Sequence, residues 1–99
     1  MSLPISIDHE RVSEFCRRSH IRRLSFFGSV LRNDFGAESD VDVLVEFEPE
    51  ATVGYFSMAR MEQELGELFG RRVDLRTPKE LSRYFRDQVL EDAQEEYVA

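Results

Sequence analysis

The chain lacks the features that would place it outside a reducing, aqueous compartment. Cys16 is the only cysteine in 99 residues, so a disulfide within the chain and a zinc site built from cysteines are both excluded. No apolar run is long enough to cross a bilayer, and the N-terminal residues lack the basic and apolar stretches of a secretory signal. We therefore expect a cytoplasmic protein that does not enter a membrane.

Positive charge is also scarce. The sequence has 13 Lys and Arg residues against 20 Asp and Glu residues, a net charge of -7, which opposes binding to long nucleic acid. Many of the arginines gather early in the chain, where they form either a solvated helix face or a local patch for a triphosphate. These early arginines are Arg11, Arg17, Arg18, Arg22, Arg23 and Arg32.

The length predicts one domain that spans residues 1–99, and no linker, repeat or low-complexity tract divides it. A domain of this size buries only about two thirds of the surface that its unfolded chain exposes. We therefore expect an interface, either with a second copy of the chain or with a different protein.

Hydrophobic periodicity and turn residues predict helices that alternate with strands. The order implies a small α/β fold in which helices flank a mixed sheet. A capping box at 77–80 opens the last helix, and the acidic tail from 91 to 99 is expected to extend or fray from it. The expected helices cover 8–19, 29–35, 54–70 and 77–90, and the expected strands cover 24–27, 41–47 and 72–76.

Two aspartates at i and i+2 begin the second strand. Asp40 and Asp42 point to the same face of that strand, where their charges repel unless a cation lies between them. Magnesium is the natural cation, because it takes carboxylate ligands and completes its shell with nucleotide phosphates. Asp74, on the third strand, also faces away from the apolar side and supplies a third carboxylate if the two strands are neighbours.

Gly28 and Ser29 stand where the first strand meets a helix. Glycine permits close backbone approach there, and the free amides at the start of a helix point toward an anion. We therefore expect a phosphate group at this turn. Arg32 lies one turn further on, where it pairs either with phosphate or with a nearby acid.

The string from Gly28-Ser29 to Asp40-Val41-Asp42 resembles the signature of the DNA polymerase beta-like nucleotidyltransferase superfamily. The stretches 44–49 and 72–79 extend the resemblance to the minimal nucleotidyltransferases called MNT proteins. One departure is Asn33, at a position where family members commonly have glycine. Asparagine tolerates left-handed backbone geometry better than most residues, so the turn can be kept.

The resemblance implies a polymerase-beta-like fold and a reaction that uses ATP and two magnesium ions. It implies that Gly28 and Ser29 hold phosphates and that Asp40, Asp42 and Asp74 bind the metals. MNT proteins are typically encoded beside a HEPN-domain ribonuclease toxin, which they neutralise as antitoxins, and some transfer AMP to a tyrosine of that toxin. Two alternatives stay open: an inactive antitoxin that acts by binding alone, and a nucleotidyltransferase that modifies a small molecule.

Overall fold

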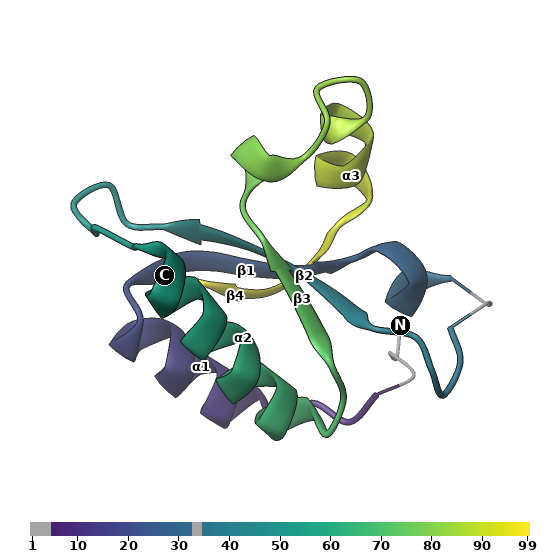
Figure 1. Cartoon of the computed structure of the whole chain (residues 1–99), viewed down its shortest axis with the longest axis horizontal. Helices are drawn as coiled ribbons and strands as arrows, with labels where there is room; N and C mark the ends of the chain where they lie inside the picture. Colours follow the sequence, from purple (N-terminus) through teal and green to yellow (C-terminus); the bar gives the residue numbers. More distant parts are fainter. Residues whose placement is uncertain (1–4, 33–34) are drawn as a thin grey trace.

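The computed structural model describes residues 5–32 and 35–99. Four strands form one mixed sheet in the order β3-β2-β1-β4, in which β1 is antiparallel to β2 and β4, and β2 is parallel to β3 (Figure 1). The strands are β1 (Ile21–Phe27), β2 (Val41–Phe47), β3 (Val73–Arg76) and β4 (Gln94–Val98). The α-helices are α1 (His9–Arg18), α2 (Tyr55–Phe69) and α3 (Arg86–Asp92), and the 3-10 helices are η1 (Gly28–Leu31) and η2 (Pro78–Glu80). This arrangement confirms the expected α/β fold.

Helices α1 and α2 lie together on one face of the sheet, whereas η2 and α3 project from the opposite side (Figure 1). Local sequence explains the ends of these helices. The side chain of Asp8 accepts a hydrogen bond from the Arg11 amide and caps α1, as predicted. Gly70 ends α2 in the left-handed conformation, with φ of 66°.

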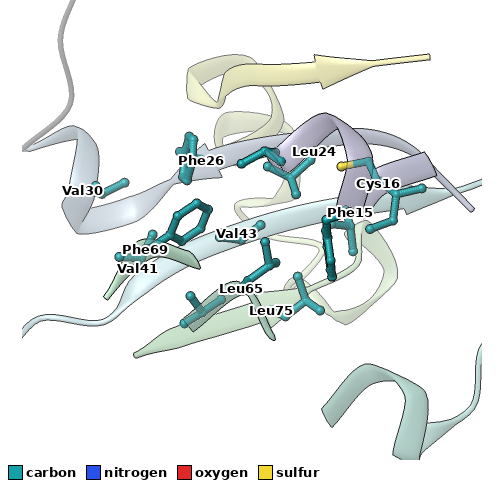
Figure 2. Packing of buried hydrophobic residues seen from close by; sticks show 14 residues of the cluster. Phe15, Cys16, Leu24, Phe26, Val30, Val41, Val43, Leu65, Phe69 and Leu75 are labelled. Atoms are coloured by element: carbon teal, nitrogen blue, oxygen red, sulfur yellow. The ribbon is translucent and has the colours of Figure 1, made fainter. Parts of the chain in front are cut away.

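The core lies between the two long helices and the sheet (Figure 2). Phe15 of α1 and Leu65 of α2 are fully buried, and the ring of Phe69 lies 5.6 Å from the ring of Phe26 on β1. On β2, Val41, Val43 and Val45 are all buried in this core. The alternation predicted for the strand is therefore confirmed, and it turns the side chains between these valines to the opposite face.

The prediction for the C-terminal tail is wrong, because residues 94–98 form the edge strand β4 instead of extending a helix. Tyr97 is the register partner of Leu24 and packs against the core. Without β4, the outer edge of β1 would present unpaired amides and carbonyls beside a core strand. Pairing between distant segments therefore decides the conformation of the tail.

The expected helix over 77–90 is also wrong in its middle. The capping box of Thr77 and Glu80 is present, but the turn that it starts is the short η2. Leu81 is extended and buried, whereas Phe85 is exposed, and α3 begins only at Arg86. Because the backbone of Leu81 is extended, the helix cannot continue through it and ends early.

Two further boundaries differ from the expectation. Strand β1 begins at Ile21 instead of Leu24, because Ile21 still pairs with Phe47 at the end of β2. The helix expected over 29–35 is the single 3-10 turn η1, and Asn33 lies outside the described residues.

Within 5–32 and 35–99, every helix is too short or too polar to cross a membrane.

Candidate active site

Gly28 makes the turn at the end of β1 in a conformation that favours glycine, with φ of 74°. A Cβ atom at this position would overlap the carboxylate of Asp42, which is the register neighbour of Phe27. The absence of a side chain at Gly28 therefore lets the backbone of η1 approach the carboxylate. The backbone amide of Ser29 uses this closeness and donates a hydrogen bond to Asp42.

Asp42 and Asp74 are direct register partners on the parallel strands β2 and β3. The pairing is anchored by a 2.8 Å hydrogen bond from the Val41 amide to the Arg72 carbonyl. Both aspartates follow a buried valine, so both side chains leave the sheet on the face opposite α1 and α2. The sequence expectation that these strands are neighbours is confirmed.

The electrostatics of Asp42 reflect this crowding. Burial raises the pKa of its carboxyl group above the ordinary value, and the nearby charges of Asp74 and Asp40 raise it further. The amide of Ser29 and the charge of Arg32 act in the opposite direction and lower the pKa of Asp42. Four of the predicted site residues therefore act on one carboxylate: Ser29 from η1, Arg32 and Asp40 from the loop between η1 and β2, and Asp74 from β3.

The other two carboxylates are held by arginines. Asp40 Oδ1 lies 3.2 Å from Arg72 Nε, and Arg76 donates hydrogen bonds of 3.0 and 3.4 Å to the two oxygens of Asp74. In the described part of the chain, no set of three His, Cys, Asp or Glu side chains is placed to hold a metal ion. The structure brings the three aspartates to one region but leaves two of them paired with cations.

The donor chemistry nevertheless fits magnesium. Three carboxylates on or beside two adjacent strands supply hard oxygen ligands, and burial, followed by repulsion from Asp74 and Asp40, raises the pKa of Asp42. A divalent cation would relieve this repulsion. The arginine contacts of Asp40 and Asp74 involve partly exposed side chains, which can rotate in solvent.

Arg71 is a site residue that sequence reasoning missed. Its Nη2 donates hydrogen bonds of 2.5 and 2.9 Å to the carbonyls of Gly36 and Ser39, and its guanidinium lies 4.5 Å from the ring centre of Phe35. The residue follows the left-handed cap of α2, and no local motif announces a role for it. Because Ser39 precedes Asp40, Arg71 holds the loop that delivers this aspartate to the site.

A glycine turn approaches a row of carboxylates on neighbouring strands of a small mixed sheet, and this arrangement suits phosphate-containing groups. The site and fold are therefore those expected of an enzyme that transfers phosphate-containing groups. The chain belongs to the nucleotidyltransferase domain family, which matches residues 9–97.

Relatives with known names agree with this membership. A candidate protein adenylyltransferase of Methanocaldococcus jannaschii, MJ0435, is 34% identical over 73 residues, which are 74% of this chain and 76% of the relative. The protein adenylyltransferase MntA of Thermococcus cleftensis is 39% identical over 62 residues, which are 63% of this chain and 61% of the relative.

Solved structures share the fold. A candidate minimal nucleotidyltransferase has a TM-score of 0.70 and 38% identity, with 86% of this chain and 85% of that chain covered. A toxin–antitoxin structure with AMP-PNP has a TM-score of 0.74 at 18% identity, covering 94% of this chain and 75% of that chain. A complex of the tri-AMPylated Shewanella oneidensis HEPN toxin with its MNT antitoxin has a TM-score of 0.65 at 17% identity, covering 92% and 70%. At these two lower identities the likeness concerns the fold alone.

Proposed function

We propose that this nucleotidyltransferase uses ATP and magnesium to transfer AMP to a tyrosine of a HEPN-domain ribonuclease toxin. It thereby acts inside the cell as the antitoxin of a toxin–antitoxin pair. The observation that supports the proposal is the row formed by Ser29, Asp42 and Asp74, which joins the glycine turn after β1 to carboxylates on two strands. Relatives described as protein adenylyltransferases and the AMPylated HEPN complex support the acceptor.

The nucleotide's phosphates would bind at the turn after β1. Gly28 leaves room for the backbone to approach, and the amide and hydroxyl of Ser29 are donors for phosphate oxygens. Arg32, whose charge already acts on Asp42, would add positive charge beside the same phosphates. The AMP-PNP in the fold neighbour supports an adenosine triphosphate as donor.

Asp40, Asp42 and Asp74 would hold the magnesium ions. When bound, magnesium offsets charge on the attacking and leaving oxygens and acidifies the acceptor hydroxyl. In the transfer, a bond forms between the tyrosine oxygen and the α-phosphorus, and the bond from that phosphorus to pyrophosphate breaks. The phenolic proton passes to the carboxylate of Asp74, and pyrophosphate leaves.

The test is transfer of label from α-labelled ATP to the HEPN protein that is encoded beside this chain. Purified wild-type protein with magnesium should label the partner, and mass spectrometry should find AMP on tyrosine. The variant Asp40→Ala/Asp42→Ala should lose the transfer while it stays folded. The matched control Glu50→Ala/Glu91→Ala removes two acidic groups at exposed positions and should keep it.

Two results would separate the alternatives. If neither wild type nor Asp40→Ala/Asp42→Ala labels the partner while both suppress its toxicity, the protein neutralises by binding alone and the enzymatic proposal is wrong. Label on a small molecule, with an unmodified partner under active conditions, would instead reject the protein acceptor.

A further inference from the structure

The connection between η2 and α3 is a short loop that one arginine closes at its base. Arg86, the first residue of α3, donates a 2.9 Å hydrogen bond from Nη2 to the carbonyl of Leu81 and a 3.4 Å hydrogen bond to the carbonyl of Lys79. We call residues 79–86 the tyrosine loop. It belongs to the part of the chain that projects from the sheet on the side opposite α1 and α2 (Figure 1).

The tip of the tyrosine loop presents a phenol to solvent. Tyr84 is 85% exposed, and its neighbour Phe85 is 55% exposed. The amide of Tyr84 donates a 3.3 Å hydrogen bond to Ser82 Oγ, which holds the backbone of the tip in a turn. Tyr97, the other tyrosine whose side chain the structure describes, is partly buried against the core. Two adjacent exposed aromatic side chains are typical of a surface that contacts another protein.

The tyrosine loop is basic in a chain that is acidic. It carries Lys79, Arg83 and Arg86 against one acid, Glu80, whereas the whole chain has a net charge of -7. The guanidinium of Arg83 lies 5.3 Å from the centre of the Tyr84 ring, so a positive charge accompanies the phenol. The candidate active site has three carboxylates, and a nucleotide triphosphate would add more negative charge to it. The loop and the site are therefore complementary in charge.

Resting on the proposed function, we propose that Tyr84 is itself an AMP acceptor, which the active site of a second copy of this chain modifies. A bond forms between Tyr84 Oη and the α-phosphorus of ATP, and the bond from that phosphorus to pyrophosphate breaks. The phenolic proton passes to the carboxylate of Asp74 in the modifying copy, and pyrophosphate leaves. The product carries a phosphodiester on the loop, where its negative charge lies beside Arg83.

The position of the tyrosine loop favours transfer between copies over transfer within one copy. Asp42 and Asp74 lie on the strands, whereas the tyrosine loop lies in the part that projects away from the sheet (Figure 1). To reach its own active site, Tyr84 would have to fold back and break the closure that Arg86 makes. The same loop can enter the active site of another copy without rearrangement. We therefore expect the modification to be intermolecular.

Intact-mass spectrometry of the full chain, after incubation with magnesium and ATP, tests the assignment. Wild type should gain the mass of one AMP group, and peptide mapping should place this group on Tyr84. Tyr84→Phe removes only the hydroxyl of an exposed ring, so the variant should stay folded and should lose the adduct. The matched control Tyr97→Phe removes the hydroxyl of a partly buried ring and should keep it. An unmodified wild type, or an adduct that persists in Tyr84→Phe, would overturn the assignment.

A mixture of two variants tests whether the transfer occurs between copies. Asp40→Ala/Asp42→Ala lacks two site carboxylates but keeps Tyr84, whereas Tyr84→Phe keeps the carboxylates but lacks the phenol. Neither variant should be modified alone, and in the mixture AMP should appear only on Asp40→Ala/Asp42→Ala. For wild type, the fraction modified per unit time should rise with protein concentration. An adduct on wild type with none in the mixture would show that Tyr84 reaches its own site, and would overturn the role of the second copy.

The charge of the tyrosine loop gives a graded test. Arg83→Gln should slow the modification of Tyr84 by about 1.5- to 5-fold at low salt, the range for loss of one exposed charge pair. The difference should shrink as salt rises, because salt screens exposed charges. Arg60→Gln removes a charge from an exposed position of α2 and should leave the rate unchanged. Equal rates for wild type and Arg83→Gln at low salt would refute docking by charge.

Parallel reactions with and without the HEPN protein separate this assignment from the proposed function. An adduct on Tyr84 together with an unmodified HEPN protein keeps the assignment and rejects the HEPN acceptor. Label on the HEPN protein together with an unmodified Tyr84 rejects the assignment and keeps the proposed function. Label on neither protein rejects both.

Discussion

Replacing Gly28 by alanine tests how tightly the turn after β1 is built against the carboxylates. Gly28 has φ of 74°, and its new Cβ would overlap Asp42 Oδ2 while it lay 3.1 Å from Cγ of the same residue. The left-handed conformation costs a residue with a side chain about 1 to 2 kcal/mol. Displacing the Asp42 carboxylate from its rotamer adds about 0.5 to 1.5 kcal/mol. Gly28→Ala should therefore lower the free energy of unfolding by about 1.5 to 3.5 kcal/mol.

Two further variants separate these costs. Gly70 has nearly the same backbone conformation, with φ of 66°, but a Cβ there would meet nothing within 4 Å, so Gly70→Ala should show the backbone cost alone. In an Asp42→Ala background the overlapping oxygen is gone, and Gly28→Ala should likewise cost only about 1 to 2 kcal/mol.

Wild type, Gly28→Ala, Asp42→Ala and the double variant form a double-mutant cycle. Their urea unfolding, supported by thermal melts, measures the coupling between positions 28 and 42. Each kcal/mol should shift the melting temperature by about 4 to 8 °C in a domain of this size. An equal cost of Gly28→Ala in the presence and absence of the Asp42 carboxylate would refute the claim that Gly28 is required by close approach to Asp42.

Three other predictions concern single residues. Burial and Asp74 raise the pKa of Asp42, so the folded state keeps a proton that the unfolded state releases, and stability falls as pH rises from the ordinary value of 3.8 through the raised pKa. Asp42→Asn should therefore be more stable than wild type at pH 7 without metal. Urea unfolding across pH should show this gain disappearing below about pH 4. A variant less stable than wild type at pH 7 would contradict the raised pKa of Asp42. Arg71→Ala removes two hydrogen bonds to loop carbonyls and should lower the free energy of unfolding by about 1 to 3 kcal/mol. Arg72→Ala breaks an exposed ion pair and should lower it by about 0 to 1 kcal/mol. Similar losses for both variants in urea unfolding would show that Arg71 does not hold the loop. Cys16 is fully buried and its pKa is raised to about 12, so a thiol reagent such as DTNB should react at the rate of unfolding and speed up with urea; rapid reaction in native buffer would count against this burial.

Much of the fold was predictable because it depends on short-range patterns. Asp8 caps α1, Gly70 ends α2, and the valines of β2 alternate with the site aspartates within a few residues of one another. Such features follow from backbone geometry and side-chain spacing, which a sequence displays directly. The candidate site residues were found in the same way, from the spacing of Gly28, Asp40 and Asp42.

The features that the sequence did not predict depend on contacts between distant segments. Strand β4 forms by pairing with β1, some 70 residues away, as in the pairing of Leu24 with Tyr97. The helix expected after Thr77 ends at Glu80, and Leu81 is extended and buried. Arg71 has no motif of its own, since its role comes from the loop that folds over it.

The sequence by itself determined the chemical groups of this protein: a glycine turn, three carboxylates and the periodicity of a small α/β domain. Only the tertiary structure decided how they are combined. Parallel pairing of β2 with β3 sets Asp42 beside Asp74, at the edge of the sheet. The physical reason is that local spacing determines which way a side chain points, whereas strand order and packing determine what it meets.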